Sequence, residues 1–173
     1  MNTSSPLPPN AGTPADSPLQ PPGRGPGFWI GVGGGLGLLK PAPGTWGSLL
    51  GLPLGWGLSQ LSPAVGAIAW LAMLAAAWAS CRRTCEVLGS KDPGQFVADE
   101  YVALAGVYLL IPFDWRTAVA GFLLFRLFDI WKPWPVRALD RVGGTAGVMT
   151  DDLAAAGYAL ACLWLLGAMS VPS

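Results

Sequence analysis

The chain has 173 residues, which suits one domain with a sizeable core, and it is 52% hydrophobic but only 12% charged. Average soluble domains carry about 25% charged residues, so this composition predicts a membrane protein. Ten basic residues balance ten acidic ones and histidine is absent, which excludes a nucleic-acid-binding protein and removes imidazole as a base or metal ligand.

The N-terminal segment differs in composition from the rest of the chain. Residues 1–27 contain eight prolines together with several glycines and serines. They lack the basic start and the apolar centre of a signal peptide. We therefore expect residues 1–27 to form a disordered tail, and residues 28–173 to form one helical membrane domain.

Uncharged stretches along the rest of the chain predict helices. Pro41–Ser80 carries no charge and is about twice as long as the 20 residues that span a membrane. The turn signal Gln60–Pro63 lies in its middle. No alternation with a period of two residues is sustained, so β-structure is disfavoured and we expect an all-α integral membrane bundle of about four to five helices. The expected helices are Thr45–Leu61, Ala64–Ser80, Phe96–Ile111, Thr117–Trp131 and Leu153–Ser173.

The basic residues predict a topology. If the helices alternate across the bilayer, the tail and the loops 81–95 and 132–150 share one face, and only Arg116 lies on the other. By the positive-inside rule, the basic face is cytoplasmic. Its basic residues are Arg24, Lys40, Arg82, Arg83, Lys91, Lys132, Arg137 and Arg141.

The third and fourth expected helices are short for a membrane span. Tyr101–Phe113 offers about 13 uncharged residues, or roughly 20 Å of helix against about 30 Å of hydrocarbon. These helices either tilt and thin the bilayer or dip into it without crossing. In both cases the charged residues near their ends lie at the depth of a lipid headgroup.

Acidic residues precede and open the third expected helix. Asp92 lies at a turn, and Asp99 and Glu100 follow where the apolar helix starts. Neighbouring carboxylates repel and burial raises their pKa, so they stay ionised only beside a cation, and a divalent ion is the obvious candidate. The alternative is that they cap the helix and interact with its dipole.

A second acidic pair follows a glycine-rich segment. Gly143–Gly147 is expected to be a loop, Thr150 a helix N-cap, and Asp151 and Asp152 the first acids of the fifth helix. Capping explains one aspartate more easily than two. Flexible glycines also allow backbone N–H groups to approach an anion, so a functional site is favoured here.

Arg126 and Asp129 lie three residues apart in an apolar segment. They share a helix face and can neutralise one another, which is the structural explanation. Charges within membrane segments are costly, however, and Lys132 follows one turn later. We favour a functional interpretation, with Arg126 and Lys132 as phosphate ligands and Asp129 as a metal ligand or orienting group.

A loop with small and hydroxyl residues leads into the first long helix. It contains Lys40 and Thr45, and a helix start of this kind can hold an anion. The same residues also make an ordinary capped helix with close packing at Gly47 and Gly51. The P-loop pattern Gly-Lys-Ser/Thr does not occur.

Together these residues supply carboxylates for a hard cation and basic groups for phosphate, which is typical of metal-assisted phosphoryl chemistry. With no histidine and no phosphocysteine or aspartyl-phosphate motif, metal-activated water is the simplest mechanism. A lipid phosphotransferase with a CDP-linked donor is disfavoured because its motif is absent. A nonenzymatic membrane adaptor or small transporter, whose acids only cap helices, stays an alternative.

Four motifs together resemble the phosphatidylglycerophosphatase A family of bacteria. They are PGTWGSLLGLP, DPGQFVADE, FRLFDIWKPWPVRALDR and GGTAGVMTDDLAA, in this order and spacing, and the resemblance covers roughly residues 29 to 170. It implies a Mg2+-dependent lipid phosphatase that converts phosphatidylglycerophosphate into phosphatidylglycerol and inorganic phosphate in phospholipid biosynthesis. It also implies a multi-pass protein of the bacterial inner membrane with its active site facing the cytoplasm.

The acidic and basic residues of the family's motifs are all present in this chain. The role given to each one below is our inference. Asp99, Glu100, Asp151 and Asp152 are the expected ligands of Mg2+. Asp92, Asp99, Glu100 and Asp129 are the expected catalytic carboxylates, with Asp99 as the candidate base. The expected substrate ligands are Arg126, Lys132, Lys40 and Thr45.

Overall fold

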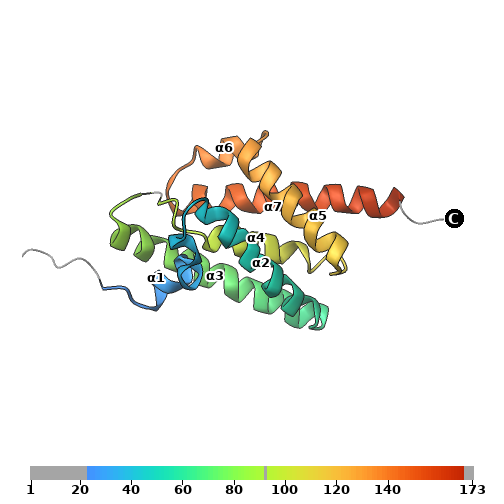
Figure 1. Ribbon diagram of the computed structural model, residues 1–173, viewed down its shortest axis with the longest axis horizontal. Helices are drawn as coiled ribbons and strands as arrows, with labels where there is room; N and C mark the ends of the chain where they lie inside the picture. The colour runs from blue at the N-terminus through green and yellow to red at the C-terminus, as the bar shows by residue number, and fades with distance from the viewer. Residues whose placement is uncertain (1–22, 92, 170–173) are drawn as a thin grey trace, which may run out of the picture.

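A computed structural model of the protein describes residues 23–91 and 93–169, and within these residues it is helical without any strand (Figure 1). The all-α fold expected from the sequence is therefore confirmed. Most of the predicted tail lies outside the described residues, and the first helix begins at Pro26. The elements are α1 (Pro26–Gly31), the 3-10 helix η1 (Gly33–Leu38), α2 (Pro43–Ser59), α3 (Pro63–Leu88), α4 (Ala98–Val107), α5 (Trp115–Trp131), α6 (Val136–Asp140) and α7 (Gly144–Met169).

Five of these helices match the five that the sequence predicts, and the differences lie at their ends. The turn at Gln60–Pro63 is confirmed, because α2 ends at Ser59 and α3 begins at Pro63. Helix α3 continues to Leu88 rather than ending at Ser80, and α7 begins at Gly144 rather than Leu153. The predicted ends follow the ends of the apolar stretches. The helices are longer because their backbone hydrogen bonds continue into the polar residues next to those stretches.

Helix α4 is the centre of the bundle. It packs against α2, α7 and α3, and Figure 1 shows it between α3 and α7, which run along the long axis of the molecule. Nearly all of its residues are buried, including Val102 and Leu104. Helix α5 packs mainly on α7, and the short α6 also lies on α7. The residues at the start of α4 are thus close to three other helices.

Glycines on α2 allow α4 to approach closely, as the sequence predicts for Gly47 and Gly51. A Cβ atom added at Gly47 would lie 2.5 Å from Val97 Cβ, and one at Gly51 would lie 3.0 Å from the carbonyl oxygen of Tyr101. Four residues further on, a Cβ at Gly55 would meet the ring of Tyr108 at 2.4 Å. This spacing of small residues is the pattern that brings helices together in membranes.

Within the described part of the chain, two helices are long and apolar enough to span a membrane. These are α3, with a mean hydropathy of 1.8, and Gly144–Gly167 of α7, with 1.2. Only 22% and 39% of their most apolar windows are buried, so most of this apolar surface faces outward rather than into a core. Helix α4, at ten residues, is about 15 Å long and too short to cross about 30 Å of hydrocarbon.

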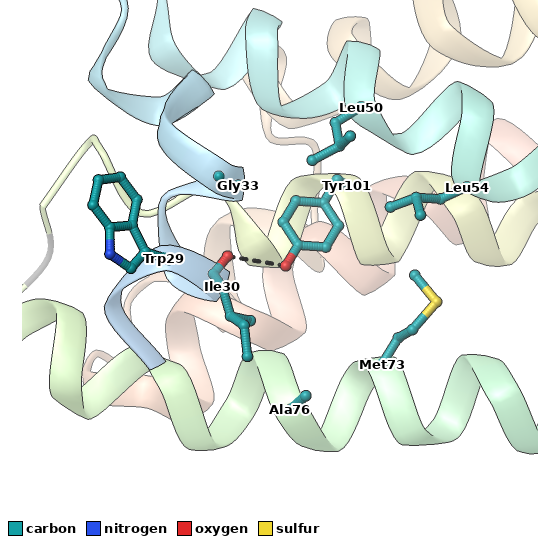
Figure 2. A pocket seen from close by; sticks show the side chains of 9 residues that line it. Trp29, Ile30, Gly33, Leu50, Leu54, Met73, Ala76 and Tyr101 are labelled. Atoms are coloured by element: carbon teal, nitrogen blue, oxygen red, sulfur yellow. Dashed lines mark hydrogen bonds between the residues drawn. The ribbon is translucent and has the colours of Figure 1, made fainter. Parts of the chain in front are cut away.

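An apolar cavity of about 480 Å³ lies on one side of α4 (Figure 2). Trp29 and Ile30 from α1, Leu50 and Leu54 from α2, and Met73 from α3 are among the residues that line it. The hydroxyl of Tyr101 donates a hydrogen bond of 3.0 Å to the carbonyl oxygen of Ile30. Burial raises the pKa of Tyr101 to about 12, with a further contribution from the charge of Asp99. Tyr101 therefore stays protonated at neutral pH.

Candidate active site

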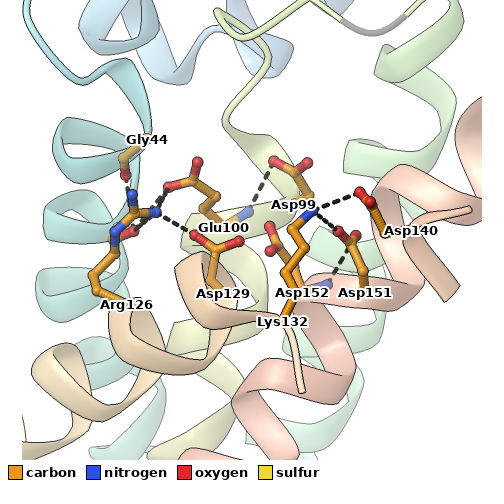
Figure 3. Close-up of polar contacts among 10 residues, drawn as sticks. Gly44, Asp99, Glu100, Arg126, Asp129, Lys132, Asp140, Asp151 and Asp152 are labelled. Atoms are coloured by element: carbon orange, nitrogen blue, oxygen red, sulfur yellow. Dashed lines mark hydrogen bonds and ion pairs between the residues drawn. The ribbon is translucent and has the colours of Figure 1, made fainter. Parts of the chain in front are cut away.

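The opposite side of α4 carries a small polar pocket of about 170 Å³. Figure 3 shows that acidic and basic side chains from α4, α5 and α7 point toward one another there. The structure thus brings together six residues that the sequence predicts for one site. The charged residues lining the pocket are Asp99, Glu100, Asp129, Lys132, Asp140, Asp151 and Asp152.

Asp99 and Glu100 occupy the first turn of α4, after the N-cap residue Val97. Asp99 Oδ1 accepts a hydrogen bond of 2.9 Å from the backbone N–H of Glu100. Burial raises the pKa of Asp99 above its ordinary value, and the charge of Glu100 raises it further. The dipole of α4 favours these acids, but their burial beside each other is unfavourable until a cation compensates.

Arg126 joins two helices through its guanidinium group. Its Nη1 donates to Asp129 Oδ2 at 2.6 Å, which confirms the predicted pair, and to Glu100 Oε2 at 3.0 Å. All three side chains are less than a fifth exposed. Burial raises the pKa of Glu100 to about 7, although the charge of Arg126 and a hydrogen bond from Ser48 lower it. The ion pair expected within α5 is therefore a three-residue cluster that reaches α4.

Lys132 ends α5 and turns toward α7. Its backbone has a φ of 48°, in the left-handed region, and its ammonium group donates to Asp140 and to Asp151, the latter at 2.9 Å. Burial lowers the pKa of Lys132, but these hydrogen bonds outweigh it and raise the pKa above its ordinary value. Lys132 therefore carries a full positive charge at the edge of the pocket.

The structure corrects the description of the second acidic pair. Because α7 begins at Gly144, only Gly143 of the predicted loop Gly143–Gly147 lies outside a helix. Thr150 is not an N-cap, since its hydroxyl donates to the carbonyl of Ala146 within the helix. Asp151 and Asp152 are buried inside α7, beyond its first turn. They cannot cap the helix from this position, so capping does not explain them.

The contribution of α2 also differs from the prediction. Lys40 and Thr45 are not among the residues that line the pocket; instead, Ser48 Oγ lies 2.8 Å from Glu100 Oε2. A Cβ atom at Gly44 would lie 2.2 Å from Glu100 Oε1, so any larger residue here would displace this carboxylate. The hydroxyl of Ser48, one turn after Gly44, was the available signal. Asp92 lies outside the described residues.

The chemistry of the pocket fits Mg2+, which prefers oxygen ligands. Among the described residues, no group of three or more acidic or cysteine side chains forms a ready-made metal site. Mg2+, however, usually keeps several waters and binds through one or two carboxylates plus substrate phosphates. The carboxylate of Asp152 faces the pocket and forms no hydrogen bond with any described residue, so it is available as such a ligand.

An all-helical bundle in which carboxylates and a lysine line one polar pocket, and an arginine binds two of these carboxylates, is equipped for phosphoryl transfer. The phosphatidylglycerophosphatase A family matches residues 29–167. The chain therefore belongs to this family and is a phosphatase, that is, a phosphoric monoester hydrolase. The alternative of a nonenzymatic adaptor or transporter is accordingly set aside.

Individual relatives agree with the family assignment. Phosphatidylglycerophosphatase A of Escherichia coli strain K12 is 34% identical over 140 residues, covering 80% of this chain and 81% of that protein. The Haemophilus influenzae protein of the same name is 41% identical over 137 residues, covering 76% and 82%. A Bacteroides thetaiotaomicron protein with the provisional name phosphatidylinositol-3-phosphatase is 34% identical over 151 residues, covering 80% and 94%. No solved structure matches the chain.

Proposed function

We propose that the protein is a Mg2+-dependent phosphatidylglycerophosphatase, which releases inorganic phosphate from phosphatidylglycerophosphate and leaves phosphatidylglycerol in phospholipid biosynthesis. One observation carries the proposal: Lys132 and carboxylates from α4, α5 and α7 line a single pocket, and Arg126 binds two of these carboxylates, Glu100 and Asp129. Two relatives that carry the phosphatidylglycerophosphatase A name align over most of their length.

Arg126 and Lys132 bind the phosphate monoester in this proposal. The Nε and Nη2 groups of Arg126 form no hydrogen bond with any described residue, because all its bonds run through Nη1. Lys132 has three N–H donors and uses two of them on aspartates. Both side chains can thus donate a hydrogen bond to a phosphate oxygen without breaking the contacts that hold them in place.

Asp99, Glu100, Asp151 and Asp152 would hold the metal. When bound, Mg2+ polarises the phosphoryl oxygen and offsets the negative charge of the carboxylates. Asp129 orients Arg126 through their 2.6 Å bond. Lys40 and Thr45 take no part in the proposal, since neither lines the pocket and, unlike Arg126, neither bonds to a described side chain that lines it.

A carboxylate accepts the proton of the attacking water. We assign this role to Asp99, because it lines the pocket and its Oδ2 atom accepts no hydrogen bond from a described residue. Asp92 is a second candidate from the sequence and lies outside the described residues. Water attacks phosphorus, the P–O bond to glycerol breaks, and the glycerol oxygen leaves with a proton as the alcohol of phosphatidylglycerol.

The proposal places the protein in the bacterial inner membrane with several passes and the pocket on the cytoplasmic side. Helices α3 and α7 have the length and the outward apolar surface for this location. Helix α4 is too short to cross, so Asp99 and Glu100 at its start lie near the membrane surface, where a lipid headgroup can reach them. The positive-inside rule favours the cytoplasmic side.

The test is phosphate release by purified protein in detergent micelles. Phosphatidylglycerophosphate should be hydrolysed with Mg2+ and not after EDTA treatment, and faster than phosphatidylinositol 3-phosphate, the substrate that the name of the Bacteroides relative suggests. Asp99→Asn together with Asp152→Asn should abolish turnover. Glu86→Gln, an exposed acid on α3, is the matched control. Normal turnover in the double variant, or turnover that survives EDTA, would contradict the proposal.

A further inference from the structure

A second pocket lies beside the acidic one, and it is basic and aromatic. Its volume is about 400 Å³, and no acidic side chain is among the described residues that line it. It is formed by the loop after α5 and by α6, whose Asp140 lines the acidic pocket. The lining residues are Trp131, Lys132, Pro133, Trp134, Arg137, Ala138 and Arg141.

Arg137 and Arg141 are the unusual residues of this pocket. Both are exposed, and neither forms a hydrogen bond or ion pair with any described residue. The bonds on this segment are made by Asp140, which binds Lys132. Two cationic groups one helical turn apart, with no partner among the described residues, are available for an anion, and guanidinium groups bind phosphate oxygens in a fixed geometry.

The two pockets share Lys132, so one ligand can occupy both. Lys132 lines the basic pocket, while its ammonium group binds Asp140 and Asp151, which line the acidic pocket. The proposed substrate has a matching distribution of charge. Phosphatidylglycerophosphate carries a terminal monoester, which is hydrolysed, and a phosphodiester one glycerol unit away, which is retained.

The aromatic residues indicate the depth of the basic pocket. Trp131 and Trp134 are 63% and 79% exposed, which is far more than a core tryptophan shows. Exposed tryptophans are enriched at the membrane–water interface, where the phosphodiesters of lipids lie. The pocket is thus suited to a lipid phosphodiester rather than to a water-soluble phosphate.

We infer that Arg137 and Arg141 bind the phosphodiester of the lipid substrate while its monoester occupies the acidic pocket, and that they thereby select phosphatidylglycerophosphate over lipids with a monoester alone. This inference rests on the proposed function and adds a determinant of its specificity. The two arginines do not contact the reacting phosphorus, so their contribution lies in substrate binding and not in the chemical step.

The kinetic test compares two lipids in nonionic micelles: phosphatidylglycerophosphate, with both phosphate groups, and phosphatidic acid, with the monoester only. Arg137→Gln plus Arg141→Gln should lower kcat/KM for phosphatidylglycerophosphate about tenfold, mainly through KM, and that for phosphatidic acid less than about twofold. Arg116→Gln, an exposed arginine at the other end of α5, is the matched control. Equal losses on both lipids, or none on phosphatidylglycerophosphate, would overturn the inference.

A binding test without metal separates this inference from the proposed function. In EDTA, short-chain phosphatidylglycerol, which has the diester only, should raise the Tm of the wild-type protein and of Arg116→Gln but not of the double variant. Sodium laurate at the same mole fraction gives the micelle the same negative charge without a phosphodiester, and it should cause no Tm shift that depends on the two arginines. An arginine-dependent shift as large as the one with phosphatidylglycerol would mean that the pocket responds to micelle charge alone, and would overturn the inference. If the wild-type protein does not hydrolyse phosphatidylglycerophosphate, the proposed function is refuted. The Tm shift with phosphatidylglycerol still tests whether the two arginines bind a phosphodiester.

Discussion

The two sides of α4 differ in chemistry although they are built by consecutive residues. Asp99 and Glu100 face the acidic pocket, and Tyr101, the next residue, faces the apolar cavity. On the acidic side, burial raises the pKa values of both carboxyl groups. On the apolar side, the hydroxyl of Tyr101 has its hydrogen-bond partner, and none of the described residues that line the cavity is charged.

This contrast shows how a cavity's size and its chemistry can point in different directions. The apolar cavity is larger, about 480 Å³ against about 170 Å³, yet it holds no group that could act on a phosphate. The acidic pocket is small and unfavourable to its own carboxylates, which is typical of sites that bind a cation or a transition state. Substitutions on the acidic side should therefore affect mainly activity. Substitutions on the apolar side and between packed helices should affect mainly stability.

The largest effect is expected on the acidic side. Asp152→Asn should lower kcat/KM for phosphatidylglycerophosphate about a thousandfold, because Asp152 is a ligand of Mg2+ in the proposed mechanism. The same change relieves repulsion among the carboxylates, so the Tm measured in EDTA should not fall. Phosphate release and thermal unfolding in detergent measure the two quantities. A parallel loss of activity and of Tm would show that Asp152 is structural.

Removing the cation of the three-residue cluster should affect stability and activity together. Arg126→Gln leaves the buried carboxylates of Glu100 and Asp129 without their cation and should lower the free energy of unfolding by about 3 kcal/mol. Adding Glu100→Gln and Asp129→Asn should restore most of this stability but not the activity. Denaturant unfolding in micelles checks the first part. If Arg126→Gln leaves the free energy of unfolding unchanged, Arg126 does not stabilise the buried carboxylates of Glu100 and Asp129.

The next largest effect is expected where α2 packs against α4. Gly51→Ala places a methyl group 3.0 Å from the carbonyl oxygen of Tyr101 and should destabilise the protein by about 2 kcal/mol. Gly57→Ala on the same helix meets no atom within 4 Å and should be neutral or slightly stabilising. The difference in Tm between the two variants measures the closeness of α2 and α4. Similar Tm values would contradict this packing.

The smallest effect is expected on the apolar side. Tyr101→Phe removes the 3.0 Å hydrogen bond to Ile30 and should cost about 1 kcal/mol of stability. Because Tyr101 points away from the carboxylates, kcat with phosphatidylglycerophosphate should stay within about twofold of the wild type. A large loss of kcat would show that the two sides of α4 are functionally coupled.

The sequence predicts the five long helices and most of the site, because apolar runs and isolated charges are local signals. Asp99, Glu100, Asp129, Lys132, Asp151 and Asp152 were all expected, and they line one pocket. The start of α7 was missed because glycines such as Gly143 and Gly144 usually indicate a loop, whereas here α7 starts at Gly144. Lys40 and Thr45 were chosen for their chemistry, but the position of α2 against α4 brings Gly44 and Ser48 to Glu100 instead.

Lys132 adopts a backbone conformation that is unfavourable for any residue with a side chain, since its φ is 48°. A glycine at this position would relax the chain and remove the amine in the same step. That relief is offset because the same change takes the cation away from the buried carboxylate of Asp151. The ion pairs of Lys132 thus hold the end of α5 in a backbone shape that it would otherwise leave.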